Sequence, residues 1–206
     1  MAAGFRVVWT LGAHGWATCA VAHGAHGTEL AASYVGPGPE ELLTAVVRLL
    51  AGEDGTSARF EAEPGTHLWT FRRIRAAAGG PADDPVLVRL LPPDGGSPAD
   101  RESPEYGAPG HGSAEYGDGG DPDGAGPDGG DPDHAGPDGG ARSTAAWSTV
   151  VEADTLARAL VRCFDDVARA HGEDGYRALW GAPFPRTALE SLRRARHEHR
   201  ARRERR

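Results

Sequence analysis

The chain has 206 residues and a net charge of −8 at pH 7, with 39% hydrophobic residues, 30 glycines and 16 prolines. This hydrophobic fraction lies below the ~45–50% typical of globular domains, which favours one folded domain accompanied by a disordered part. No run approaches the ~18 apolar residues that a membrane-spanning helix needs, and residues 1–6 lack the features of a secretory signal. Cys19 and Cys163 lie in apolar patterns that predict buried thiols. We therefore expect a cytoplasmic protein without contact to a membrane.

Charge is divided unevenly along the chain. Residues 92–143 carry 12 acidic side chains against two Arg, whereas residues 193–206 carry eight Arg against two Glu. Because the acidic segment is rich in Gly and Pro and has little apolar surface to bury, we predict that it is disordered. It contains a ten-residue tandem repeat, GDPDGAGPDG followed by GDPDHAGPDG. The D-P-D-G in each copy resembles the start of a calcium-binding EF-hand loop, but the final Glu ligand of such a loop is missing. We therefore interpret the repeat as an insertion in a surface loop that arose by replication slippage, in preference to a calcium site.

The first half of the chain predicts three strands, a helix and two further strands. Apolar residues alternate in 5–11, 16–22 and 29–35, and the Gly-rich turns between these segments indicate an antiparallel meander. Helical spacing of apolar residues then begins at Pro39 and ends at Gly52. Strands at 57–63 and 67–74 follow, joined by a turn that contains Gly65.

The second half predicts two strands around the acidic segment and two helices after it. Segments 85–91 and 145–151 read as strands, so the acidic segment is expected to connect two neighbouring antiparallel strands. A helix capped by Asp154 or Thr155 is expected to end at Gly172. Tyr176, Trp180, Phe184 and Pro185 are then predicted to pack together before a last helix, which lacks large apolar residues beyond Ala195 and is expected to be solvated or frayed there.

These elements predict an α+β fold: a mainly antiparallel sheet of about seven strands in the order βββ-α-ββββ-α-α, with helices packed on one face. Residues 1–91 plus 144–192 are expected to form the single domain. Residues 92–143 are the disordered acidic insert, and residues 193–206 are an Arg-rich C-terminal tail.

Four stretches of the domain are similar to a family of small proteins of Streptomyces-type actinomycetes: WTLGAHGWATC, ARFEAEPGTHLWTF, TLARALVRCFDDVA and YRALWGAPFP. The absence of Lys, Asn and Gln is typical of the GC-rich genomes of such organisms. The resemblance covers nearly all of the chain outside the acidic insert. It implies a cytosolic stand-alone domain and no established activity, and an immunity-type role follows only by analogy of fold.

Paired carboxylates are the main candidate for chemistry. Glu61 and Glu63 are predicted on one face of a strand, ~7 Å apart, where two carboxylates can divide acid and base roles. The alternative function is therefore a small hydrolase that uses this pair, with His14 or His67. The simpler interpretation is a solvated strand face balanced by neighbouring Arg residues.

Other signatures of chemistry are missing. The sequence has no G-x-S-x-G elbow, no Walker loop and no G-x-G-x-x-G after a strand, so we expect no cofactor. His23 and His26 lie in a Gly-rich turn in which their side chains do not converge, so no metal is expected. The Arg-rich tail lacks interleaved aromatic residues, which makes nucleic acid an improbable partner.

We therefore predict a non-catalytic cytoplasmic protein that binds another protein. Most of the five tryptophans are expected in the core, with a fraction exposed to anchor a partner. A sheet with helices on one face leaves its other face free for contact. The candidate binding residues on that open face, which would steer a partner by charge, are Arg6, Glu61, Glu63, Arg72 and Arg73.

Overall fold

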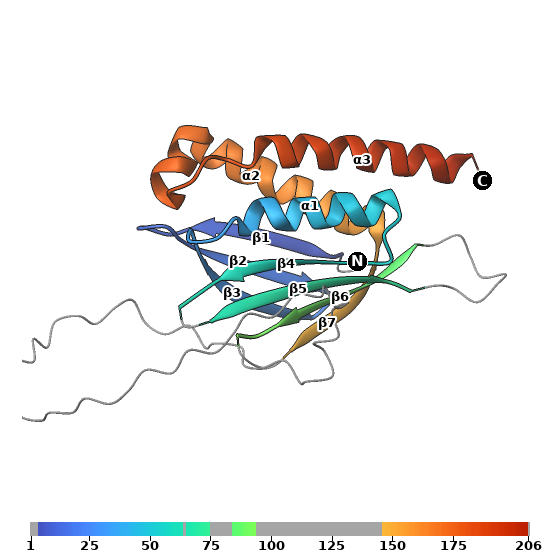
Figure 1. Cartoon of the computed structure of the whole chain (residues 1–206), viewed down its shortest axis with the longest axis horizontal. Coiled ribbons are helices and arrows are strands. Elements are labelled where there is room, and N and C mark those ends of the chain that lie inside the picture. The colour runs from blue at the N-terminus through green and yellow to red at the C-terminus, as the bar shows by residue number, and fades with distance from the viewer. Residues whose placement is uncertain (1–3, 64, 75–83, 94–145, 206) are drawn as a thin grey trace, which may run out of the picture. The chain divides into compact units, whose positions relative to one another are not determined.

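The computed structural model describes residues 4–63, 65–74, 84–93 and 146–205, which hold three helices and seven strands (Figure 1). The strands are β1 (Arg6–Leu11), β2 (Trp16–His23), β3 (His26–Ser33), β4 (Gly55–Glu61), β5 (Thr66–Arg73), β6 (Pro85–Leu91) and β7 (Trp147–Glu152), and the helices are α1 (Gly38–Ala51), α2 (Ala153–Trp180) and α3 (Arg186–Glu204). The predicted α+β class and element order are confirmed. None of these three helices has the length and apolar character to span a bilayer.

The strands form two antiparallel sheets rather than the single sheet that we predicted. One sheet has the order β1-β2-β3 and the other the order β4-β5-β6-β7. Helix α1 separates β3 from β4 in the chain, and alternation of apolar residues does not reveal whether strands on either side of a helix will pair. Each strand turns alternate side chains inward. In β1, for example, Val7 and Trp9 are buried whereas Arg6 and Val8 are exposed.

Strands β6 and β7 are antiparallel neighbours, with Leu90 opposite Trp147 and Val86 opposite Val151. The acidic insert therefore connects the two strands of a hairpin, as the sequence predicted. The prediction that residues 92–143 are disordered falls, from residue 94 onward, outside the described residues.

The helices lie together on one side of the strands (Figure 1). Pro39 stands in the first turn of α1, and Gly52 ends the helix with a left-handed φ of 118°. Helix α2 follows β7 directly and bends at Gly172, whose φ of 65° and ψ of 175° are not helical. The prediction placed the end of this helix at Gly172, but helical structure resumes there and continues to Trp180.

Both sheets and the helices share one core, with Trp9 of β1 near its centre. The Trp9 ring centroid lies 5.6 Å from that of Phe60 in β4 and 5.4 Å from that of Trp180 in α2. The predicted packing of aromatic residues around Trp180 is confirmed. Trp180 and Tyr176 are fully buried, and the Tyr176 and Phe184 ring centroids are 5.2 Å apart in an edge-to-face arrangement.

The sequence left open whether the end of α3 is a solvated helix or frays. The helix anchors on the core through Leu189 and Leu192, as expected, and beyond Ala195 it continues as a helix to Glu204. Polar contacts hold its second half. The Arg196 guanidinium donates to both carboxylate oxygens of Asp154, at 2.8 and 3.2 Å, and the His199 side chain is buried. Residues of the predicted Arg-rich tail are therefore part of the packed helical layer.

Candidate interaction surface

The five residues predicted to bind a partner lie in four separate places. Arg6 borders a shallow depression of about 340 Å³ on the outward face of the three-stranded sheet. Glu61 ends β4, and Glu63 lies in the turn that follows. Arg72 is on the outward face of the four-stranded sheet, at the end opposite Glu61, because it pairs with Gly55, the first residue of β4. Arg73 is partly buried among other elements, so the predicted set does not form one surface.

The Arg73 guanidinium forms an ion pair and hydrogen bonds inside the fold. It pairs with Asp84, donates to the Leu49 carbonyl at the end of α1, and donates to the Glu53 carbonyl at 3.2 Å. The Leu49 carbonyl, in the last turn of α1, also accepts a hydrogen bond from the Gly52 N–H at 3.0 Å, so the Arg73 guanidinium adds a second donor there. Arg73 therefore acts as a structural residue that joins β5, α1 and β6.

One of the two histidines named for the alternative hydrolase, His67, lies on the other side of the sheet from Glu61. His67 lies opposite Phe60, whose side chain is buried in the core, so the His67 side chain is on the inward face of the sheet. Glu61 lies opposite Thr66 on the outward face and accepts a hydrogen bond of 2.8 Å from the Thr66 hydroxyl. Burial lowers the pKa of His67, opposed by a hydrogen bond with the Leu91 backbone. His67 and Glu61 thus face opposite sides of one sheet.

Metal-binding chemistry finds no support in the part of the chain that the structure describes. Within residues 4–63, 65–74, 84–93 and 146–205, no group of three or more His, Cys, Asp or Glu side chains is arranged to hold a metal ion. Cys19 and Cys163 are both free and buried, and burial raises the pKa of each thiol. Their thiolate forms are therefore disfavoured, which makes both poor nucleophiles.

The strongest surface feature is a group of exposed apolar side chains at one end of the strands. Trp16 is 36% exposed, Tyr34 52% and Val35 67%. Trp16 begins β2 opposite Ser33, the residue before Tyr34, so the three residues lie at the same end of the three-stranded sheet, and exposed apolar side chains that gather in one region can mark a site of interaction. We name this group, with the polar residues beside it, the end surface; it consists of His14, Trp16, Tyr34, Val35, Glu61 and Glu63.

Backbone hydrogen bonds fasten three segments together beneath the end surface. The Gly15 N–H in the β1–β2 turn donates to the Leu179 carbonyl in α2 at 2.9 Å. The Tyr34 N–H, after β3, donates to the Gly15 carbonyl at 2.9 Å. The exposed side chains thus stand on a frame that is tied to both a sheet and a helix.

Two glycines seat the ring of Tyr34. Gly15 and Gly181 have positive φ values of 78° and 88°, which favour glycine at both positions. A Cβ atom added to Gly15 would overlap the Tyr34 ring, and one added to Gly181 would lie 3.2 Å from its Cδ2 atom. The ring therefore lies directly on two stretches of bare backbone, while half of its surface faces solvent.

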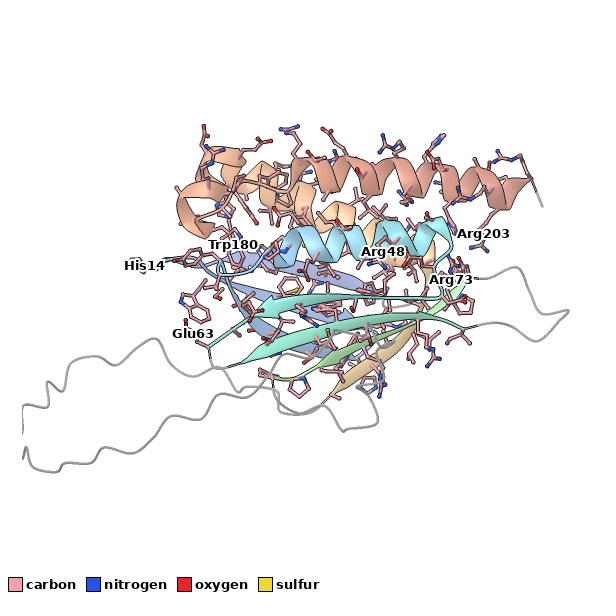
Figure 2. All side chains as sticks on the ribbon, viewed as in Figure 1. His14, Arg48, Glu63, Arg73, Trp180 and Arg203 are labelled. Atoms are coloured by element: carbon pink, nitrogen blue, oxygen red, sulfur yellow. The ribbon has the colours of Figure 1, made fainter. Side chains whose placement is uncertain are left out.

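His14 occupies a strained position in the turn before Trp16. Its φ of 56° makes it the one non-glycine residue with a positive φ among those that the structure describes. For a residue with a side chain this conformation costs about 1 kcal/mol. Figure 2 shows His14 at the same end of the molecule as Glu63.

Two carboxylates border the apolar part of the end surface. The Glu61 side chain lies against Gly36, next to Val35, since a Cβ atom added to Gly36 would be 2.9 Å from the Glu61 Cγ atom. Glu63 is exposed in the β4–β5 turn, where the Ala62 N–H donates to the Gly65 carbonyl at 2.9 Å. The end surface therefore combines exposed aromatic rings with negative charge.

Comparisons with protein-family models, curated proteins and solved structures found no match for this chain. The resemblance to the family of small proteins from Streptomyces-type actinomycetes stays a prediction.

Proposed function

We propose that the protein is a non-catalytic module that binds another protein, and that the end surface is its binding site. The observation that carries this proposal is the packing of the Tyr34 ring against the backbone of Gly15 and Gly181. Aromatic side chains in fixed positions supply most of the binding energy in many interfaces. Because the Tyr34 ring already rests on the backbone, binding would order it at little cost in entropy.

The surroundings of Tyr34 support the same function. Val35 follows Tyr34 in the chain, Trp16 begins β2 opposite Ser33, and the Glu61 side chain lies against Gly36. An apolar centre with a polar border is the usual anatomy of a protein–protein interface. The proposal includes a cytoplasmic location, which agrees with two cysteines that are both unpaired and buried.

The test compares two exposed valines on different surfaces. Val35 belongs to the end surface and is 67% exposed, whereas Val150 lies on β7 and is 47% exposed. Affinity purification from the native host would use three tagged baits: wild type, Val35→Ser and Val150→Ser. Mass spectrometry would identify the proteins captured by each. We expect a stoichiometric partner with wild type and Val150→Ser that is lost with Val35→Ser. Equal capture by all three proteins, or no partner with any, would contradict the proposal.

A further inference from the structure

We infer that the partner binds as an extended segment, which adds a strand to the three-stranded sheet along the free edge of β3 and continues onto the end surface. This inference rests on the proposed function, because it names the form that the partner takes at the same site. The backbone groups of β3, the position of the end surface and a depression beside β3 support it.

The backbone of β3 has hydrogen-bonding groups that β2 does not use. The Tyr34 N–H donates to the Gly15 carbonyl, and in an antiparallel pair such bonds recur at every second residue. The N–H and C=O groups of Gly27, Glu29 and Ala31 therefore point away from β2. All three residues are exposed, and no hydrogen bond from another described segment reaches these groups. They form an edge with which an added strand can pair.

The open part of this edge is residues 27–31. In the described part of the chain, β3 is the last strand of its sheet. Strand β4 comes close where the chain leaves β3, since the Glu61 side chain lies against Gly36, and Ser33 is buried there. Residues 27–31 contain no Pro or Lys, which many edge strands carry as protection against pairing, and their charge lies on Glu29 alone.

The free edge leads directly to the end surface. Ser33 ends β3, Tyr34 and Val35 follow it in the chain, and Trp16 pairs with Ser33. Because an antiparallel strand rises by ~3.4 Å per residue, a segment that continues two residues past Ala31 reaches the level of Ser33. Its next side chains can contact the exposed side chains of the end surface. One extended segment can therefore use both features.

A depression beside the edge can accept a side chain of the added strand. The depression of about 340 Å³ on the outward face of the sheet is bordered on its β3 side by Gly27, Thr28 and Glu29. Gly27 has no side chain to block access from the edge. Sites of strand addition combine main-chain hydrogen bonds with pockets for alternate side chains. We therefore expect the segment to place a large apolar residue beside Gly27.

The test uses proline, which removes a backbone N–H. Ala31→Pro removes an N–H that points to the free edge, so it breaks no hydrogen bond within the sheet. Ser148→Pro is the matched control on β7, the last strand of the other sheet. Because the Ala153 N–H donates to the Asp84 carbonyl, the same alternation directs the Ser148 N–H away from β6. Circular dichroism and thermal unfolding would verify that both variants fold.

Binding peptides would be selected from a random library, so the partner need not be identified. The full-length protein would be immobilised to enrich a phage library of random dodecapeptides, in parallel with Val35→Ser and Val150→Ser. Peptides that require Val35 would be synthesised, and fluorescence anisotropy would give their Kd values for wild type and the two proline variants. Hydrogen–deuterium exchange followed by NMR would compare the Glu29 and Ala31 amides of wild type with and without peptide.

We expect Ala31→Pro to raise the Kd by about tenfold or more, whereas Ser148→Pro should leave it within about twofold of wild type. Bound peptide should slow exchange of the Glu29 and Ala31 amides by about tenfold or more. If Ala31→Pro does not fold, the exchange measurement alone decides.

Two results would overturn the inference and leave the binding site in place. One is a set of peptides that require Val35 but bind Ala31→Pro as tightly as wild type and leave both amides unprotected. The other is a loss of binding with Ser148→Pro instead of Ala31→Pro. If no peptide distinguishes Val35→Ser from Val150→Ser, the proposed function fails together with the inference.

Discussion

The Nε2 atom of His199 lies 3.0 Å from the Oδ2 atom of Asp84, which joins the second half of α3 to the start of β6 across 115 positions of sequence. Asp84 also pairs with Arg73, whose guanidinium holds the Leu49 carbonyl at the end of α1. Arg202, one turn beyond His199, donates to the neighbouring Leu50 carbonyl at 2.8 Å. This polar cluster makes the basic C-terminal helix a structural part of the fold.

The first prediction concerns acid stability. Burial would raise the pKa of Asp84, but hydrogen bonds from His199 and Arg73 outweigh it and lower the value from 3.8 to about 2. A carboxyl with a depressed pKa in the folded state adds stability that is present above pH ~4 and is lost as the pH falls toward 2. Urea unfolding followed by circular dichroism should show that the contribution of Asp84 to the free energy of unfolding falls by about 2 kcal/mol between pH ~4 and pH ~2. Asp84→Asn should remove that contribution. An identical pH dependence in wild type and Asp84→Asn would contradict the assignment.

The second prediction separates two histidines on the same helix. His199 is 6% exposed and contacts Asp84, whereas His197 is exposed. His199→Ala should lower the free energy of unfolding by about 2 kcal/mol, because it removes a buried partner of a carboxylate. His197→Ala should change it by less than about 0.5 kcal/mol. Thermal or urea unfolding of the two variants tests this. Equal effects would mean that the end of α3 is not packed as described.

The third prediction concerns Trp180. The ring is fully buried and contacts Trp9 and Tyr176 at centroid distances of 5.4 and 6.4 Å. Trp180→Ala should destabilise the protein by about 3–5 kcal/mol through loss of buried surface and formation of a cavity. Trp16→Ala, which removes a partly exposed ring, serves as the control and should cost much less. A loss below about 1 kcal/mol for Trp180→Ala would show that the aromatic cluster is not a core element.

The fourth prediction uses two glycines with similar backbone angles. Gly15 has a φ of 78° and faces the Tyr34 ring, whereas Gly24 has a φ of 66° and nothing within 4 Å of an added Cβ atom. Gly24→Ala should cost about 1 kcal/mol from backbone strain alone. Gly15→Ala should cost clearly more, and it should also displace the Tyr34 ring and weaken any binding at the end surface. Melting temperatures together with Tyr fluorescence or NMR shifts measure both effects. Similar losses in the two variants would show that Gly15 does not seat Tyr34.

The fold was largely predictable because apolar periodicity marks buried faces directly. The alternation of Val7 and Trp9 identified β1, and the spacing of Leu156, Leu160 and Phe164 identified α2. The second half of α3 was not predictable in the same way. Its contacts pair polar side chains with partners more than 40 positions away, and hydrophobic pattern carries no information about such pairs.

The candidate site was predicted only in part. The sequence identified Glu61 and Glu63 as residues of an outward surface, but it could not show that Arg73 is used inside the fold. It also assigned Tyr34 and Val35 to the end of a strand without indicating their exposure. The end surface is recognised from the close approach of Gly15 and Gly181 to the Tyr34 ring. These two glycines are far apart in the sequence and come together only in the folded chain.

The most direct test of the central claim is the affinity of the purified partner for wild type, Val35→Ser and Val150→Ser, measured by isothermal titration calorimetry with all three proteins verified as equally stable. If the end surface is the binding site, Val35→Ser should raise the Kd by about tenfold, whereas Val150→Ser should leave it within about twofold of wild type. Equal Kd values for Val35→Ser and wild type, or a larger loss with Val150→Ser, would contradict the claim.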